Sequence, residues 1–189
     1  NDTGQANYSP KMLSYLINRG ISEAVAKKCK VGEGVELMPR GGEWKQCNTI
    51  QFKYYLEGEL LNVKYRTADK VFKLCTGAEL LPYNLDSIKD KDECIITEGE
   101  FDCLSFVEAG FTSCVSVPNG ANSNLSYLDD FIEGWFEDKK VIYIASDTDA
   151  KGLELRDELI HRFGAERCKI VTYGDCKDAN EHLVKYGKQ

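Results

Sequence analysis

Hydrophobic and polar positions follow two different rhythms along the chain, and the change comes near residue 92. From residue 49 to residue 77 apolar and polar residues alternate, with turn signals at "EG" and "AD". This alternation predicts an antiparallel meander of three strands. Residues 31–47 are rich in glycine and show little periodicity, so neither a strand nor a helix is predicted there.

Two short helices are predicted before the meander, within residues 9–29. Ser9 can cap the first helix, and Pro10 suits its first position because a helix N-terminus needs no N–H from that residue. Gly20 ends this helix, and Ser22 can cap the second.

After residue 92, short apolar runs alternate with amphipathic segments. The runs have the length of buried strands and lie at residues 93–97, 112–117, 140–146 and 168–173. The amphipathic segments predict helices at residues 100–110, 123–137, 150–164 and 178–187. This order predicts an α/β fold with a Rossmann-like parallel sheet of about four strands and helices on both faces.

A polar, charged stretch at residues 84–92 predicts a domain boundary. We therefore expect a smaller N-terminal α+β subdomain over residues 1–90, which carries the meander, and an α/β domain over residues 91–189. The net charge of −7 is uneven, since residues 1–73 carry 12 Lys and Arg against 8 Asp and Glu, and the rest carries 12 against 23. Two surfaces with different partners would explain this asymmetry, and so would chance.

Composition excludes several classes of protein. No apolar run approaches the 18 residues of a membrane span, and the polar first ten residues lack the apolar core of a signal peptide, so we expect a cytoplasmic protein without membrane contact. The chain has 8 cysteines but no C-x-x-C pair. Buried reduced thiols are therefore expected in place of a zinc cluster.

Acidic residues gather at the carboxyl ends of three predicted strands. They are Glu98, Asp102, Asp147, Asp149, Asp175 and Asp178. Each alone could be a helix cap, but ligands bind at this edge of an open parallel sheet. Neighbouring like charges repel by about 4 kcal/mol per pair, so a cation would stabilise the cluster. Oxygen ligands without histidine favour Mg²⁺ or Mn²⁺, with two ions suited to in-line displacement at phosphorus.

Three phrases of the sequence resemble the motifs of the TOPRIM domain, which primases, topoisomerases and some nucleases share. They are "TEGEFDCLS", "ASDTDAKG" and "CKDANE". The last phrase, together with "LNVKYRTADKVFKLCTG" upstream, is similar to the primase region of T7-like phage primase–helicases and of Twinkle helicases. This resemblance covers roughly residues 10–187 and implies a TOPRIM fold.

The resemblance implies a role for particular residues. Glu98 would be the general base or a metal ligand, Asp147 and Asp149 would bind metal, and Asp102 and Asp178 would support the acidic cluster. Glycine is expected at Gly99 for a sharp turn and at Gly152 for a close entry into a helix. The basic residues Lys64, Arg66 and Lys73 would contact nucleotide phosphates or template, and Asn180 belongs to the matched phrase.

Those basic residues also have a simpler interpretation. With Lys53 and Lys70 they occupy outward positions of the predicted meander, so they could form a solvated strand face.

The function implied is that of a DNA primase catalytic core of phage or mobile-element type, which builds RNA primers from ribonucleoside triphosphates on single-stranded DNA. The family further implies a hexameric helicase domain in the same parent chain. Two alternatives stay open, a metal-dependent TOPRIM nuclease and a non-catalytic single-stranded DNA-binding module of a replicative helicase.

Overall fold

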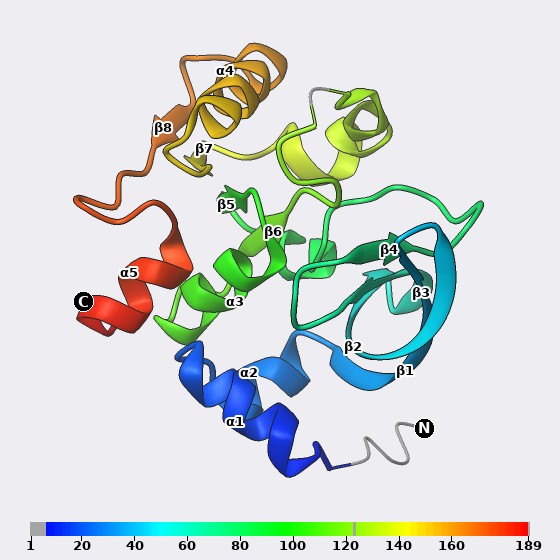
Figure 1. Ribbon diagram of the computed structural model, residues 1–189. Helices are drawn as coiled ribbons and strands as arrows, with labels where there is room; N and C mark the ends of the chain where they lie inside the picture. Colours follow the sequence, from blue (N-terminus) through cyan, green and yellow to red (C-terminus); the bar gives the residue numbers. More distant parts are fainter. Residues whose placement is uncertain (1–6, 123, 189) are drawn as a thin grey trace.

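The computed structural model describes residues 7–122 and 124–188 (Figure 1). The described chain opens with two helices, α1 (Pro10–Asn18) and α2 (Glu23–Lys28). The Ser9 hydroxyl accepts a hydrogen bond from the backbone N–H of Met12, and Ser22 caps α2 in the same way. Both helices and both caps are as predicted.

The antiparallel sheet that follows is larger than predicted. Its strands, in spatial order, are β1 (Val31–Arg40), β2 (Glu43–Leu56), β3 (Glu59–Arg66) and β4 (Phe72–Leu74). The expectation of no element over residues 31–47 is wrong. Glycine and charged residues interrupt the apolar positions of β1, and of these Val31 and Met38 are buried whereas Val35 and Leu37 are exposed. Gly41 and Gly42 both have positive φ and form the two-residue turn of the β1–β2 hairpin. The dipeptide "GG" is therefore the sequence feature that indicates this hairpin.

The second sheet is parallel, as predicted, with the spatial order β6-β5-β7-β8. Its strands are β5 (Glu93–Thr97), β6 (Cys114–Ser116), β7 (Val141–Ala145) and β8 (Cys168–Ile170). The chain passes through α3 (Glu100–Glu108) from β5 to β6, through α4 (Ala150–Phe163) from β7 to β8, and ends in α5 (Ala179–Tyr186). The two crossovers run in opposite directions along the sheet, so right-handed connections place α3 and α4 on opposite faces, as Figure 1 shows.

The helix predicted over residues 123–137 is wrong in its described part, and Ser123 lies outside the described residues. A 3₁₀ turn (Ser126–Phe131) runs into an irregular turn (Ile132–Phe136). Gly134 has a φ of 81°, which interrupts helical geometry within the second turn.

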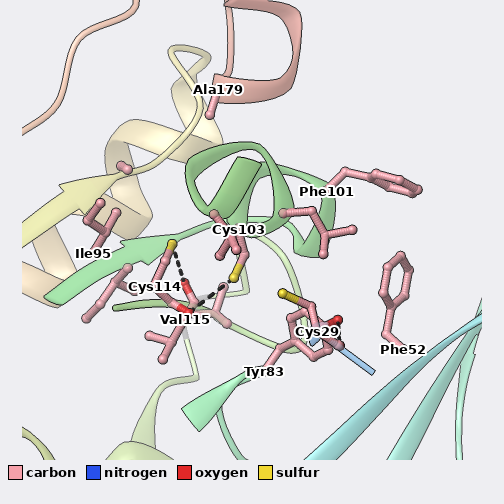
Figure 2. Packing of buried hydrophobic residues seen from close by; sticks show 14 of the residues in the cluster. Cys29, Phe52, Tyr83, Ile95, Phe101, Cys103, Cys114, Val115 and Ala179 are labelled. Atoms are coloured by element: carbon pink, nitrogen blue, oxygen red, sulfur yellow. Dashed lines mark hydrogen bonds between the residues drawn. The ribbon is translucent and has the colours of Figure 1, made fainter. Parts of the chain in front are cut away.

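One hydrophobic core joins the two sheets. The Phe52 ring of β2 lies 5.5 Å from the Phe101 ring of α3 and 5.7 Å from the Tyr83 ring, measured between centroids (Figure 2). A β-bridge pairs Tyr83 with Ser116 of the parallel sheet. The predicted boundary falls at a 3₁₀ turn (Leu85–Ile88), and the division of the chain at residue 90 stays a prediction.

The cysteines are free, as expected, and each is buried or half-buried. Cys29, Cys103 and Cys114 belong to the core near Tyr83 (Figure 2). Burial raises the pKa of the Cys103 thiol well above its usual range, so the thiol stays protonated. In the described parts of the chain, no helix has the length and apolar character needed to cross a bilayer.

Candidate active site

A cleft of about 980 Å³ opens between the carboxyl edge of the parallel sheet and strands β3 and β4. Of the acidic residues that line it, we call those next to the sheet edge the acidic edge: Glu98, Asp102, Asp147 and Asp178. Of the basic residues that line it, we call those on the other side the basic wall: Arg19, Lys64, Arg66 and Lys70. The predicted charge asymmetry thus corresponds to two facing walls of one cleft.

The acidic edge is held together by backbone groups. Glu98 follows β5, and its Oε2 accepts a hydrogen bond of 2.8 Å from the backbone N–H of Asp147, which follows the neighbouring strand β7. Asp102 lies in the first turn of α3, and its Oδ1 accepts a bond of 3.1 Å from the backbone N–H of Asn180. Because backbone atoms supply the donors, the carboxylates are placed by the topology of the sheet.

Burial and mutual repulsion perturb these carboxyl groups. Burial, with the charges of Glu98 and Asp178, raises the pKa of Asp147 to about 7. Burial first, and then the charges of Asp178 and Asp147, raise the pKa of Asp102 well above its usual range. The pKa of Glu98 is also raised, mainly by burial. Such shifts are typical of sites that take up protons or cations.

The remaining acidic residues behave differently from one another. Asp149 is exposed and caps α4, since its Oδ1 accepts a bond of 2.8 Å from the N–H of Gly152. Asp178 caps α5 in the same way but also lines the cleft. Asp175 lies away from the cleft, where it accepts hydrogen bonds from Lys185 and Tyr186. Of the predicted acidic residues, Asp149 and Asp175 do not line the cleft, whereas the other four do.

Gly152 lets α4 start directly against the loop that carries Asp147. A Cβ at position 152 would lie 2.1 Å from the carbonyl oxygen of Asp147, closer than any real contact. A Cβ at Gly99 would lie 3.1 Å from Asp102 Oδ2. The close helix entry expected at Gly152 is confirmed.

On the basic wall, Lys64 faces the parallel sheet, so the outward position expected for it is wrong. Its Nζ donates to Glu100 Oε1 at 2.8 Å and to the carbonyl oxygen of Pro118 at 2.7 Å. The Tyr54 hydroxyl donates to the same Glu100 oxygen at 2.5 Å. Alternation shows which residues share a face, but only the packing of the two sheets decides which face is covered.

Arg66 is also buried, with 7% of its surface exposed, and in the part of the chain that the structure describes it forms no ion pair. Its guanidinium lies 4.9 Å from the centroid of the Phe101 ring, and its Nε has no hydrogen-bond partner among the described residues. Burial, the largest cause, lowers the pKa of Arg66, to which the charge of Arg19 contributes. A buried, unpaired guanidinium at a cleft wall is suited to an anionic ligand.

Arg19 was not among the predicted site residues. Its guanidinium lies 4.8 Å from the same Phe101 ring, and its Nη1 donates to Asn180 Oδ1 at 3.0 Å. Its only sequence signal was its place directly before the helix-ending Gly20. Two guanidinium groups therefore share one aromatic ring beside the cleft.

Asn180 joins three elements rather than offering free polar atoms. Its Nδ2 donates to the carbonyl oxygen of Arg19 and to Ser105 Oγ, each at 2.9 Å. Together with the bond from its backbone to Asp102, these contacts fix the end of α1 and the start of α5 against α3. Asn180 thus has the contacts of a positioning residue.

The ammonium of Lys73 is not brought together with Lys64 and Arg66. Lys73 pairs with Tyr65 across β3 and β4, which puts it on the opposite face of the sheet. Its Nζ donates to Glu36 Oε1 at 2.8 Å and to the carbonyl oxygen of Leu37 at 2.7 Å. Lys73 is nevertheless one of the residues that line the cleft.

For a metal, the side chains alone give an incomplete ligand set. Among residues 7–122 and 124–188, no three His, Cys, Asp or Glu side chains lie close enough to hold an ion. Asp147 Oδ1 is nevertheless buried and has no hydrogen-bond partner within the described residues. This oxygen fits a cation, because a buried carboxylate oxygen without a partner is otherwise costly.

Part of the chain matches a known protein family. The sequence profile of a family described as Toprim-like matches residues 95–183. Residues 95–183 form a Toprim-like domain. Glu98, Asp147 and Asp178 lie inside it, whereas Lys64 and Arg66 lie outside, so the cleft is formed between the Toprim-like domain and the antiparallel sheet.

The whole fold is that of primase catalytic fragments. The primase fragment of the bacteriophage T7 primase-helicase protein matches 91% of this chain and 70% of its own, with a TM-score of 0.74 and 22% identity. That likeness extends past the Toprim-like domain to the antiparallel sheet, since it covers most of the chain.

Two plant proteins are similar in sequence. The primase homolog protein of Arabidopsis thaliana is 37% identical over 157 residues, which is 73% of this chain and 47% of that protein. The Twinkle homolog protein, chloroplastic/mitochondrial, of the same plant is 36% identical over 159 residues, or 73% of this chain and 22% of that protein. The chain thus spans less than half of either relative.

Proposed function

We propose that this chain is the catalytic core of a DNA primase, which joins ribonucleotides on a single-stranded DNA template. One observation carries the proposal: an acidic edge with an unpartnered Asp147 oxygen faces a basic wall with the unpaired Arg66 across one cleft. Nucleotidyl transfer needs both, because the triphosphate is anionic and its reaction is catalysed mainly by positioning and charge neutralisation.

The fold family implies Mg²⁺ or Mn²⁺, and the residues present fit such a group. Asp147 would hold it through Oδ1, and Glu98 and the Asp149 oxygen that does not cap α4 are the further proposed ligands. Because these carboxylates do not form a close set of three within the described residues, water or triphosphate oxygens would complete the coordination. A bound divalent cation would neutralise the carboxylates and the triphosphate charge. Two such ions are proposed, the number suited to in-line displacement at phosphorus.

The protein's own residues have distinct proposed roles. Arg66 and Arg19 would bind phosphate oxygens, since guanidinium groups match phosphate geometry. Glu98 would accept the proton of the attacking hydroxyl, because its raised pKa makes it a stronger base than an ordinary glutamate. Lys64 would hold Glu100 and the wall in place, with template contact as its second proposed role. Asp102 and Asp178 would support the acidic cluster by adding negative charge beside Glu98 and Asp147.

The test is dinucleotide synthesis from ribonucleoside triphosphates on a single-stranded template with Mg²⁺. Asp147→Ala should lower the rate by at least about a thousandfold. Asp147→Asn keeps the shape of the side chain and should be similarly inactive, which separates a lost charge from a lost fold. The control is Asp157→Ala, which removes an exposed aspartate of α4 and should retain full activity.

Other outcomes would contradict the proposal. Nicking of plasmid DNA with Mn²⁺, without ribonucleotide incorporation, would assign the site to a nuclease. Binding of single-stranded DNA with no metal-dependent product would make the chain a non-catalytic module. We further propose a helicase domain in the same parent chain. The name of the T7 neighbour, a primase-helicase protein, supports this part of the proposal.

A further inference from the structure

A second cleft of about 350 Å³ lies away from the acidic edge, where α2 meets the outer face of β2. Three lysines line it: Lys28, Lys30 and Lys53. Tyr55 contributes an aromatic side chain, and Lys30 Nζ lies 5.8 Å from the centroid of its ring. No residue lines both this cleft and the central one.

The strand β2 separates the two clefts. Successive side chains of a strand point to opposite faces, and Phe52 and Tyr54 are fully buried in the core. Lys53 therefore points outward, away from the acidic edge. Tyr55 follows a register shift in β2 and lines the same cleft as Lys53. The clefts also lie toward opposite ends of α3, since Asp102 lines the first and Val107 the second.

The lysines of this cleft are not used for internal ion pairs. Among the residues that the structure describes, no carboxylate lies within salt-bridge distance of Lys28, Lys30 or Lys53. The acidic residue of the cleft, Asp86, accepts hydrogen bonds from the backbone N–H groups of Glu57 at 2.7 Å and Gly58 at 3.0 Å. The cleft thus has an excess of positive charge in a chain of net charge −7.

A glycine makes room for one of these cations. A Cβ at Gly32 of β1 would lie 3.3 Å from Lys53 Cε and 3.5 Å from its Nζ. Gly32 does not have a positive φ, so its backbone conformation does not require glycine. Glycine weakens a strand interior, and it commonly marks a place where another group approaches closely. Here that group is the ammonium-bearing side chain of Lys53.

We propose that this lysine cleft, defined by Lys28, Lys30, Lys53 and Tyr55, binds the phosphate backbone of a single-stranded nucleic acid. Lys28 and Lys30 are exposed at the rim, an arrangement suited to a polymer that passes over the surface. Tyr55 offers a ring on which a base can stack. The site acts in binding and is independent of the chemistry of the central cleft.

The experiment measures binding of a fluorescent single-stranded deoxythymidine oligomer by anisotropy, over a series of salt concentrations, with EDTA and without nucleotides. The triple variant K28A/K30A/K53A should bind about tenfold more weakly at physiological salt. Its plot of log affinity against log salt should be shallower by about 2, because each phosphate contact on a single strand contributes about 0.7.

The matched control is K11A/K91A/K169A, which removes the same charge from exposed lysines elsewhere and should change neither value. Lys169 is a close counterpart of Lys30, since its Nζ lies 5.9 Å from the Tyr143 ring. Equal losses in both variants would overturn the proposal, because they would report general charge alone. Unchanged binding by K28A/K30A/K53A would also overturn it.

Two further arms identify the ligand. A photo-crosslinker in the Tyr55→p-benzoylphenylalanine variant should label the oligomer, and the same group at Tyr143 should not. Tripolyphosphate should compete only weakly. If tripolyphosphate or polyglutamate instead bound tightly and depended on the three lysines while the oligomer did not, the cleft would belong to a nucleotide or to an acidic protein segment, and the proposal would fail.

Discussion

The acidic edge and the basic wall face each other across one cleft, but they are built by different rules. Carboxylates reach the acidic edge because parallel strands end side by side, and backbone N–H groups of Asp147 and Asn180 hold two of them. Cations reach the basic wall only because one face of an antiparallel sheet packs against the Toprim-like domain. Lys64 of β3 faces inward, whereas Lys73 of β4 pairs with Tyr65 and lies on the other face of the sheet.

That difference teaches that topology alone assembles an anionic site in a parallel sheet, whereas the cationic partner depends on tertiary packing. The cations of the antiparallel sheet also differ in whether they have a counter-charge. Lys64 pairs with Glu100 and Lys73 pairs with Glu36, whereas Arg66 forms no ion pair within the described residues, which supports the proposal that it binds a ligand.

The largest expected effect concerns the buried pair that joins the two walls. Glu100→Ala should lower the free energy of unfolding by about 3–5 kcal/mol, because Lys64 would remain buried without a counter-charge. Urea unfolding measures this loss. The control Asp92→Ala breaks an exposed pair with Lys140 and should cost less than about 1 kcal/mol.

A double variant separates charge from packing. Lys64→Met combined with Glu100→Leu should recover most of the lost stability, since apolar side chains of similar volume can replace a buried ion pair. If Glu100→Ala alone left the free energy of unfolding unchanged, Lys64 would not need Glu100 as its counter-charge. The distinction between Lys64 as a structural cation and Arg66 as a binding cation would then be wrong.

A smaller effect should come from the charge of the acidic edge. In the unfolded chain Asp147 loses its proton near pH 3.8, but in the folded chain only near pH 7. The folded state therefore binds the extra proton between these values, so metal-free stability should fall as pH rises from about 4 to 7. After allowance for solvent screening, Asp147→Asn should remove on the order of 2 kcal/mol of this fall.

Thermal unfolding across that pH range, with EDTA, measures the effect. Mg²⁺ added above pH 7 should raise the unfolding temperature of the original protein more than that of Asp147→Asn. A flat pH profile in the metal-free protein would show that the acidic edge is better solvated than its burial indicates.

The smallest effect distinguishes two cations of the antiparallel sheet. Arg66→Ala should weaken binding of a ribonucleoside triphosphate about tenfold, since the free guanidinium would be lost. Lys73→Ala should change it less than about twofold, because its ammonium is bonded to Glu36 on the other face of the sheet. Calorimetric titration compares the two, and the reverse order would contradict the separate roles of the two faces.

The Toprim-like part of the fold could be predicted because short buried strands alternate with capped helices and because acidic residues mark the strand ends. Asp102 and Asp147 illustrate this, since their placement needs only the order of strands. Asp175 shows the limit of the rule. It follows the edge strand β8, where the chain turns away and the carboxylate finds Lys185 instead.

The antiparallel part could be predicted less well for physical reasons. Val35 and Leu37 are exposed, so the hydrophobic pattern of β1 does not mark a buried face. Arg19 comes from a helix end remote in sequence and meets Arg66 only through the ring of Phe101. The irregular turn at Gly134 was predicted as helix because its apolar spacing is helical, while the glycine conformation overrides it.

Phe101 belongs to two environments at once. Its ring packs on Phe52 in the core, and the guanidinium groups of Arg19 and Arg66 lie against it at the cleft. An anion that immobilised both guanidinium groups would therefore restrict the motion of the Phe101 ring, and so of the core, without contacting the core itself. Ligand binding would then slow the hydrogen exchange of amides of α3 and β2 that lie away from the ligand. Local opening of the cleft and of the core would be coupled.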